Sequence, residues 1–190
     1  MKFINLNKKK QEHLIFDKKD KYVVFFHNLS GKLIFEITKS GIELYIYGLF
    51  TGKKSDEFKI ETIQHHIAPG SLSDLLIKGV FEDESKLLYQ GLIRLEKSAQ
   101  HSHAYQKNQN LILSPGVFVD SRPFLEILAN DVFCTHGSTT GKLNKDQLFY
   151  AISRGLTAKE AETMLVSGFI EEIYNKIKEK VPSFNRTLSS

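Results

Sequence analysis

The chain has 190 residues, 41% of them apolar, which suits one packed domain or one domain with a small appendage. The single cysteine excludes an intrachain disulfide. The net charge of +4 comes with lysines crowded near the start, which we interpret as a solvated segment. No apolar run approaches the ~20 residues that cross a bilayer, so we expect a cytoplasmic protein that does not bind a membrane. The sequence shows no basic groove interleaved with aromatic residues, so we expect no nucleic-acid partner.

Residues 1 to about 135 predict β-structure. Segments 22–26, 32–37 and 42–47 are rich in β-branched and aromatic residues, and Ser-Gly pairs separate them. In the second segment Leu33 and its alternate neighbours are apolar, although Ile34 interrupts the alternation. These segments therefore predict short strands with one face exposed to water.

A weak repeat follows in the middle of the chain. Apolar clusters begin at Leu75, Leu92 and Leu111, which are 17 and 19 residues apart, and no helical pattern lies between them. This regularity predicts a β-solenoid in which each coil turns one apolar strand inward and stacks it on the next. A sandwich or barrel of short strands is the alternative, but the Asn-Gly and Asp-Gly dipeptides typical of hairpins are absent.

The pattern changes to helical after Gly141. Asn144 with Gln147 predicts the start of a helix over 145–154, which Gly155 ends. Thr157 with Glu160 predicts a capping box for a second helix over 157–179. The predicted organisation is a β-helix core over 1–137, a helical domain over 142–182 and a tail over 183–190.

Cys134 and His136 form the best candidate site. Residues two apart on a strand share a face, so a sulfur and an imidazole would lie together. This pair suits iron, zinc or copper, but it fills only half of a tetrahedral shell, so a second chain would have to complete it. A buried cysteine beside a hydrogen-bonded histidine is the structural alternative.

Two other histidine pairs invite comparison. His65 and His66 are adjacent, so on a strand they face opposite sides and cannot chelate one ion. His101 and His103 are two apart and could share a face, which with His136 raises the alternative of a small β-barrel metalloenzyme. The Ser-Thr-Thr segment between Gly137 and Gly141 is interpreted as a turn, and no nucleotide-binding or serine-nucleophile motif occurs.

Six segments of the chain match one known family. They are 66–73 (HIAPGSLS), 91–94 (GLIR), 109–114 (QNLILS), 119–127 (VDSRPFLEI), 130–141 (NDVFCTHGSTTG) and 148–155 (LFYAISRG). In these segments the chain resembles the C-terminal half of the SufB/SufD family of iron–sulfur cluster assembly proteins. The resemblance covers about 60–175, and the chain is shorter at its N-terminus than family members. The sequence around Cys134 looks more like SufD than SufB.

This resemblance implies a right-handed parallel β-helix followed by a small helical domain. It implies a SufD-like scaffold subunit, not an enzyme, that pairs through its β-helix with a SufB-like subunit or with itself. The family's interface histidine matches His136 and the neighbouring cysteine matches Cys134, where iron or a transient iron–sulfur cluster would sit. The cluster cysteine of SufB would fall near Asn108, which offers no thiol. The resemblance also implies a SufC-type ATPase docked on Leu148, Phe149, Tyr150, Arg154 and Phe169.

Overall fold

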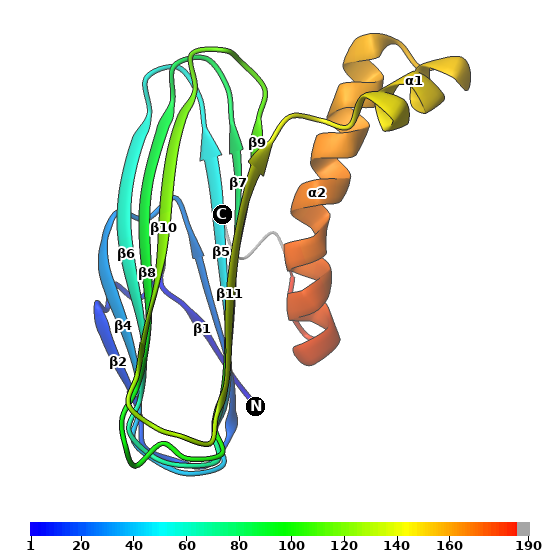
Figure 1. Cartoon of the computed structure of the whole chain (residues 1–190). Coiled ribbons are helices and arrows are strands. Elements are labelled where there is room, and N and C mark those ends of the chain that lie inside the picture. Colours follow the sequence, from blue (N-terminus) through cyan, green and yellow to red (C-terminus); the bar gives the residue numbers. More distant parts are fainter. Residues whose placement is uncertain (186–190) are drawn as a thin grey trace.

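The structure is a computed structural model that describes residues 1–185, and it consists of a flattened β-solenoid with two helices beside it (Figure 1). The strands are β1 (Lys2–Asn5), β2 (His13–Phe16), β3 (Lys21–His27), β4 (Gly31–Ile37), β5 (Glu43–Gly52), β6 (Glu57–His66), β7 (Leu72–Phe81), β8 (Lys86–Leu95), β9 (His103–Ile112), β10 (Phe118–Ile127) and β11 (Phe133–Gly141). The helices are α1 (Lys145–Ser153) and α2 (Ala158–Lys180).

Successive strands alternate between two parallel sheets. The odd-numbered strands form a six-stranded sheet in the order β1-β3-β5-β7-β9-β11. The even-numbered strands form a five-stranded sheet in the order β10-β8-β6-β4-β2. Every adjacent pair is parallel, so each coil contributes one strand to each sheet. The predicted parallel β-solenoid followed by a helical pair is confirmed.

The coil is longer than the sequence repeat predicts. Glu43, Leu72, His103 and Phe133 lie side by side in one sheet, with 29 to 31 residues between neighbours. The predicted interval of 17 to 19 residues separates successive strands that lie in opposite sheets. The prediction of one inward-facing strand per coil is therefore wrong, because each coil contributes two strands whose inner faces line the interior.

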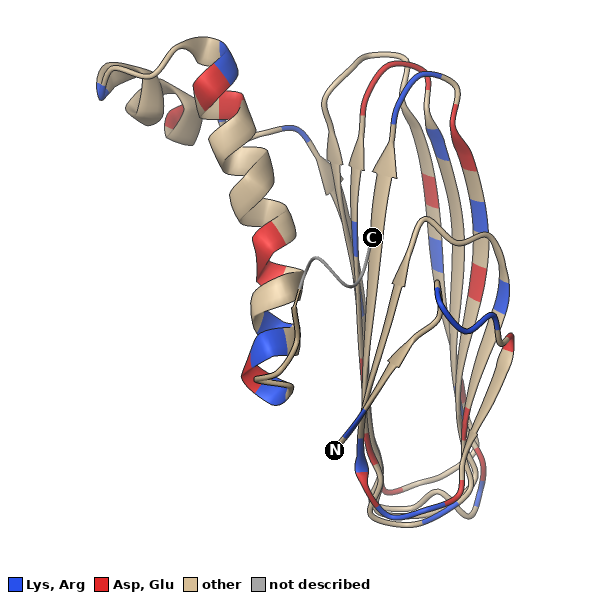
Figure 2. Cartoon of the chain, turned by 180° about the vertical axis from the view of Figure 1, so that it is seen from behind, with Lys and Arg blue, Asp and Glu red and all other residues tan. Residues whose placement is uncertain are grey.

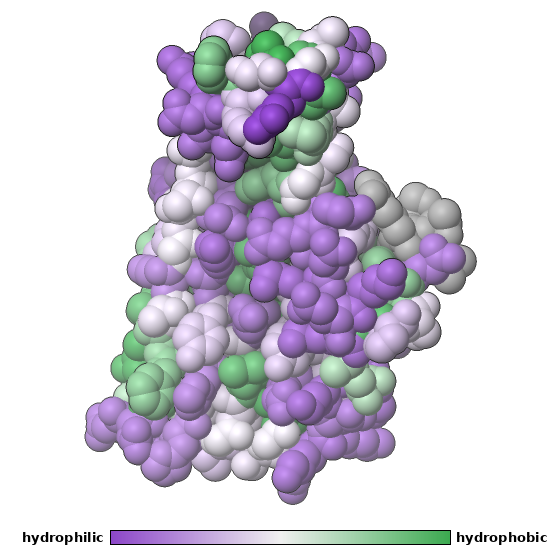
Figure 3. Space-filling view, turned by 90° about the vertical axis from the view of Figure 1, so that its right-hand side faces the viewer, coloured by the Kyte–Doolittle hydropathy of each residue, from purple (hydrophilic) through white to green (hydrophobic). Residues whose placement is uncertain are grey.

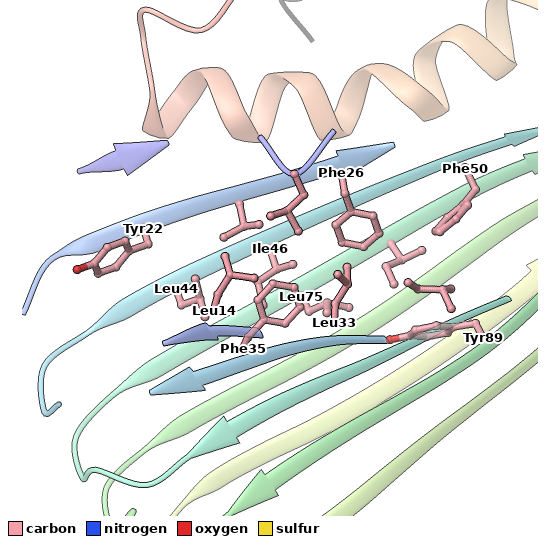
Figure 4. Close-up of a cluster of buried hydrophobic side chains, with 14 of the residues drawn as sticks. Leu14, Tyr22, Phe26, Leu33, Phe35, Leu44, Ile46, Phe50, Leu75 and Tyr89 are labelled. Carbon is pink, nitrogen blue, oxygen red and sulfur yellow. The ribbon is translucent and has the colours of Figure 1, made fainter. Parts of the chain in front are cut away.

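The core lies between the two sheets. Leu33, Phe35 and Ile37 of β4 are buried at alternate positions, as the sequence predicts. Ile34 faces outward beside Ile63 of β6, which explains why it interrupts the alternation. Figure 4 shows how side chains from strands of both sheets meet in this interior. Burial of this apolar surface is the main source of stability.

The outer faces of the two sheets differ. Helix α2 covers part of the six-stranded sheet, where Ile173 and Ile177 pack on Phe25, Tyr47 and Leu76. The five-stranded sheet has no helix on it among the described residues, and basic and acidic residues lie along its strands (Figure 2). Ion pairs join these strands. The ion pairs include Lys32–Glu61, 2.9 Å, and Arg94–Glu126, 3.6 Å, and His65 Nε2 also lies 3.0 Å from the Glu96 carboxylate.

The helix caps are confirmed. The Asn144 side chain accepts hydrogen bonds from the backbone N–H groups of Asp146 and Gln147. Thr157 and Glu160 form the predicted capping box, which satisfies N–H groups that the first turn of α2 leaves free. Gly155 has φ of +98°, a conformation that ends α1 and favours glycine.

The segment from Gly137 to Gly141 is the last part of strand β11, so its interpretation as a turn is wrong. The chain then reaches α1 through a short connection. Of the predicted tail, 186–190 lie outside the described residues. No helix in the described part of the chain is both long and apolar enough to cross a bilayer.

Candidate functional site

The solenoid ends on two strands that each have one free edge. Within residues 1–185, strand β11 pairs with β9 only, and β10 pairs with β8 only. Apolar side chains gather at this end, with exposed fractions from 39% to 62%. They are Phe118, Phe124, Leu125, Ile127, Leu128 and Phe133. Leu125 and Ile127 lie beside buried Ile93 and Leu95 of β8, so they face inward at the open end, whereas the phenylalanines face outward. Exposed apolar side chains at the end of a sheet are typical of an interaction surface.

Cys134 lies on β11 and turns toward the interior. It is half-buried and packs against a small cluster that includes Ile93, Leu95 and Ala104. Burial raises the pKa of the Cys134 thiol to about 11, because the apolar surroundings disfavour the thiolate. In the isolated chain the sulfur is therefore a protonated thiol at neutral pH, which is a poor metal ligand.

His136 lies two residues along the same inner face but is exposed, because β11 is the last strand of its sheet in the part of the chain that the structure describes. Its neighbour in β9 is Gln106, a buried residue whose Nε2 donates a hydrogen bond to the Gly91 carbonyl, 3.2 Å. Among the described residues, Gln106 Oε1 has no hydrogen-bond partner. The imidazole thus stands at the open end with polar groups behind it.

A row of polar side chains continues from His136 along the inner faces of β9, β10 and β11. Asn110 Nδ2 donates to Asn108 Oδ1, 2.7 Å, and to Thr140 Oγ1, 3.3 Å. Ser138 Oγ donates to Ser121 Oγ across the gap between the sheets, 2.9 Å. Asn108 and the segment from Gly137 to Gly141 are named in the sequence analysis, but these side chains were not brought together at one site there. The signal was the unbroken polar run from Gln106 to Asn110, but only the fold shows which of its side chains face inward.

The donor set at this end is incomplete for a metal ion. In residues 1–185 no group of three or more histidine, cysteine or acidic side chains could hold a metal. His136 and Cys134 offer at most two ligands, whereas iron or zinc sites take four or more. A metal ion at this position would need further ligands from a second protein or from other atoms bound with the ion.

The alternative of a small β-barrel metalloenzyme is wrong. The sheets are open, and His103 faces outward against the Phe133 ring, with centroids 4.8 Å apart, while His136 faces inward. His101 does not lie on the strand. It occupies a left-handed turn, φ of +59°, and its Nδ1 pairs with Asp131, 2.8 Å. These three histidines cannot share one ion.

His65 and His66 do face opposite sides of β6. His66 is buried, and its Nε2 is 2.7 Å from Ser73 Oγ. His65 lies on the outer face between Glu36, 3.6 Å, and Glu96, 3.0 Å. Both therefore have structural partners in the solenoid.

The helices present a second exposed apolar surface. Phe149 and Tyr150 of α1 are 74% and 61% exposed, Leu148 is half-buried, and the Arg154 guanidinium lies 5.1 Å from the centre of the Tyr150 ring. Figure 3 shows hydrophobic surface on this end of the helical pair, at the top of that view. Phe169 lies apart from the others, on α2 beside the solenoid.

Sequence comparisons relate this chain to known proteins. The family described as "SUF system FeS cluster assembly, SufBD core domain" matches residues 27–169. A SufBD family iron–sulfur cluster assembly protein of Synechocystis sp. is 31% identical over 152 residues, covering 80% of this chain and 32% of that protein. Two proteins named iron–sulfur cluster assembly protein SufD are also similar. The Escherichia coli protein is 32% identical over 105 residues, covering 55% of this chain and 25% of its own length.

The Bacillus subtilis SufD is 29% identical over 126 residues, covering 66% of this chain and 28% of its own length. This chain thus spans about a quarter to a third of the length of these relatives. The family match includes most of the solenoid, α1 and more than half of α2. The chain belongs to the SufBD core-domain family of the SUF iron–sulfur cluster assembly system.

Proposed function

We propose that this chain acts as a SufD-like scaffold subunit, which binds partners and does not itself carry out catalysis. Its solenoid pairs with a SufB-like subunit or with a second copy, and its helices dock a SufC-type ATPase. ATP hydrolysis belongs to that ATPase. The observation that carries the proposal is the presence of two separate exposed apolar surfaces, one on the last coil and one on α1.

The last coil is suited to pairing because its two edge strands are long. Unpaired backbone N–H and C=O groups on an edge strand favour the addition of a strand from another chain. The apolar side chains beside this edge, Leu125 and Ile127 among them, would lose contact with water on pairing. The inner row from His136 to Thr140 would then be enclosed.

Iron or a nascent iron–sulfur cluster is the proposed cargo at this joint. His136 supplies an accessible imidazole, and Cys134 supplies a thiol that must lose its proton to bind metal. The partner or the cargo supplies the remaining ligands. Replacing His136 with Ala should lower the iron and sulfide recovered with the complex while leaving the complex itself intact.

The proposal is tested by co-expression with a SufB-type subunit and a SufC-type ATPase, followed by affinity purification of this chain. The unaltered chain should recover both proteins. Ile127→Asp should lose the SufB-type subunit and keep the ATPase, whereas Phe149→Asp should do the reverse, since each charge would have to be buried at one surface.

Ile15→Asp is the matched control, because Ile15 is 56% exposed on β2 at the opposite end of the solenoid. This variant should recover both partners. Failure of the unaltered, folded chain to recover either protein would refute the proposal. Equal losses from Ile15→Asp and Ile127→Asp would refute the assignment of pairing to the last coil.

A further inference from the structure

Lys78 is a buried cation beneath helix α2. It lies on the outer face of β7, and only 2% of its side chain is exposed. Its ammonium donates a hydrogen bond to the Phe169 carbonyl, 2.9 Å, and pairs with the Glu172 carboxylate. The same ammonium lies 4.0 Å from the centre of the Phe169 ring. All three contacts are to α2, so this residue ties the helix to the sheet.

The Phe169 carbonyl and the Glu172 carboxylate stabilise the charged form of Lys78. Burial lowers the pKa of Lys78, while the hydrogen bond and the charge of Glu172 oppose that effect. A buried ammonium without such partners would be strongly unfavourable. The helix therefore has to sit where Phe169 and Glu172 both reach the same nitrogen.

The rest of the contact between α2 and the sheet is apolar. Ile170, Ile173 and Ile177 pack among Val23 and Leu49 and their neighbours. Apolar contact is non-directional, so it holds the helix against the sheet but specifies its rotation and its position along the axis only weakly. A buried ammonium bound to a backbone carbonyl and a carboxylate of the same helix specifies both, because each contact has to reach one nitrogen.

Lys78 contacts α2 at the position where the helix begins to extend beyond the sheet. The helix residues that pack on the sheet begin at about Phe169, and the turns over 158–168 extend beyond it toward α1. Figure 1 shows α1 at this far end of α2, away from the strands. The contact therefore stands where the projecting half of α2 begins.

We propose that Lys78 is a positioning residue that fixes the angle at which the α1–α2 pair projects from the solenoid. Its contribution to ATPase docking rests on the function proposed above, because that angle sets where a protein bound to α1 is held relative to β11. The geometry itself needs no partner and can be tested on the chain alone.

The test is a distance measurement between two spin labels by pulsed electron paramagnetic resonance. Exposed Lys159 on α2 and exposed Lys59 on β6 are replaced by labelled cysteines, with Cys134→Ser to remove the native thiol. Chains with Lys78 should give one narrow distance distribution. Lys78→Met, which is similar in length and free of charge, should give a distribution at least twice as broad or a shifted one.

Two further variants keep the test decisive. Glu172→Gln alters only the partly exposed partner of Lys78, so this variant should fold even if Lys78→Met folds poorly. It should also give a broader or shifted distance distribution. Lys107→Met removes an exposed lysine from the neighbouring strand β9 and should leave the distribution narrow. An unchanged narrow distribution in folded Lys78→Met, or in Glu172→Gln, overturns the proposal. Neither result depends on ATPase binding, so the proposed function would stand or fall separately.

Discussion

At the scale of single residues, two glycines of the last coils differ in the space that surrounds them. Gly91 of β8 lies opposite Gln106, and a Cβ at this position would collide with the Tyr89 hydroxyl and Gln106 Nε2. Gly137 of β11 has open space where its Cβ would be. Both are strand glycines near the candidate site, so they form a matched pair.

Gly91→Ala should lower the free energy of unfolding by about 1–3 kcal/mol, because an overpacked core must shift to accept the methyl group. Gly137→Ala should be neutral or slightly stabilising, since alanine restricts the unfolded chain and meets nothing in the folded one. Urea unfolding of the two variants measures this difference. Equal effects would show that the predicted crowding at Gly91 is not real.

His66 makes stability depend on pH. Burial lowers the pKa of His66 to about 4, because the charged ring is disfavoured between the sheets. In the unfolded chain the same ring titrates near 6.5. The unfolded state therefore binds more protons between these values, and stability is full above about pH 6.5 and is lost as the pH falls toward 4.

The expected loss from this one residue is about 3 kcal/mol across that window. His66→Gln retains a side chain that can bond to Ser73 but does not titrate. Urea unfolding at pH 7, 5.5 and 4 should show a smaller decline for the variant than for the unaltered chain. Parallel declines would mean that the buried ring does not control the acid response.

At the scale of elements, the corners of the solenoid stack residues of one backbone conformation. Gly41, Gly70 and His101 precede β5, β7 and β9 at equivalent positions, with φ of +74°, +61° and +59°. Backbone hydrogen bonds link the corners, from Gly41 N to the Gly70 carbonyl, 3.1 Å, and from His101 N to the Asp131 carbonyl, 2.6 Å. This left-handed conformation favours glycine.

His101→Val should therefore destabilise the chain by about 1–2 kcal/mol relative to His101→Gly, because a β-branched residue is strained there. Both variants lack the contact between His101 Nδ1 and Asp131, so their difference reports the backbone strain alone. Thermal unfolding of the pair checks it. If the valine and glycine variants unfold together, the corner does not require positive φ.

Local patterns in the sequence predict the strands and helix caps, because the cause of each lies within a few residues. Leu33 to Ile37 alternate, and Asn144 and Thr157 cap their own helices. The coil length was not predictable in this way, because strand pairing joins residues about 30 positions apart. Gly137 looked like part of a turn, yet pairing with β9 makes its segment a strand.

The candidate site shows the same division. The shared face of Cys134 and His136 follows from their spacing, but the burial of the thiol depends on β8 and on the corner before β9. Predicting the polar row from Gln106 to Thr140 would require knowing which side chains of β9 and β11 face inward. The position of Lys78 under α2 joins residues more than 90 positions apart, and no sequence pattern announces it.

At the scale of the whole molecule, the two ends of the solenoid differ in the length of their edge strands, which bears on the pairing proposed above. Strands β1 and β2 at one end have four residues each, whereas β10 and β11 at the other have ten and nine. A short edge strand offers few backbone groups to another chain. The long edge with exposed apolar neighbours is the one that suits a second subunit.

The orientation of the free groups on β11 can be read from its pairing. The Phe133 N–H donates to the Ser102 carbonyl of the adjoining coil, 3.0 Å. Because N–H groups alternate along a strand, that of Thr139 also points to β9, and that of Ser138 points to the free edge. Proline lacks this N–H, so its effect depends on which side it faces.

Ser138→Pro should leave the isolated chain folded but weaken pairing with a SufB-type subunit or a second copy at least tenfold, since a proline on the free edge blocks strand addition. Thr139→Pro should instead destabilise the chain, because it removes a hydrogen bond to β9. Light scattering after size-exclusion chromatography measures pairing, and circular dichroism measures folding. Full pairing by a folded Ser138→Pro chain would show that subunits do not join through the edge of β11.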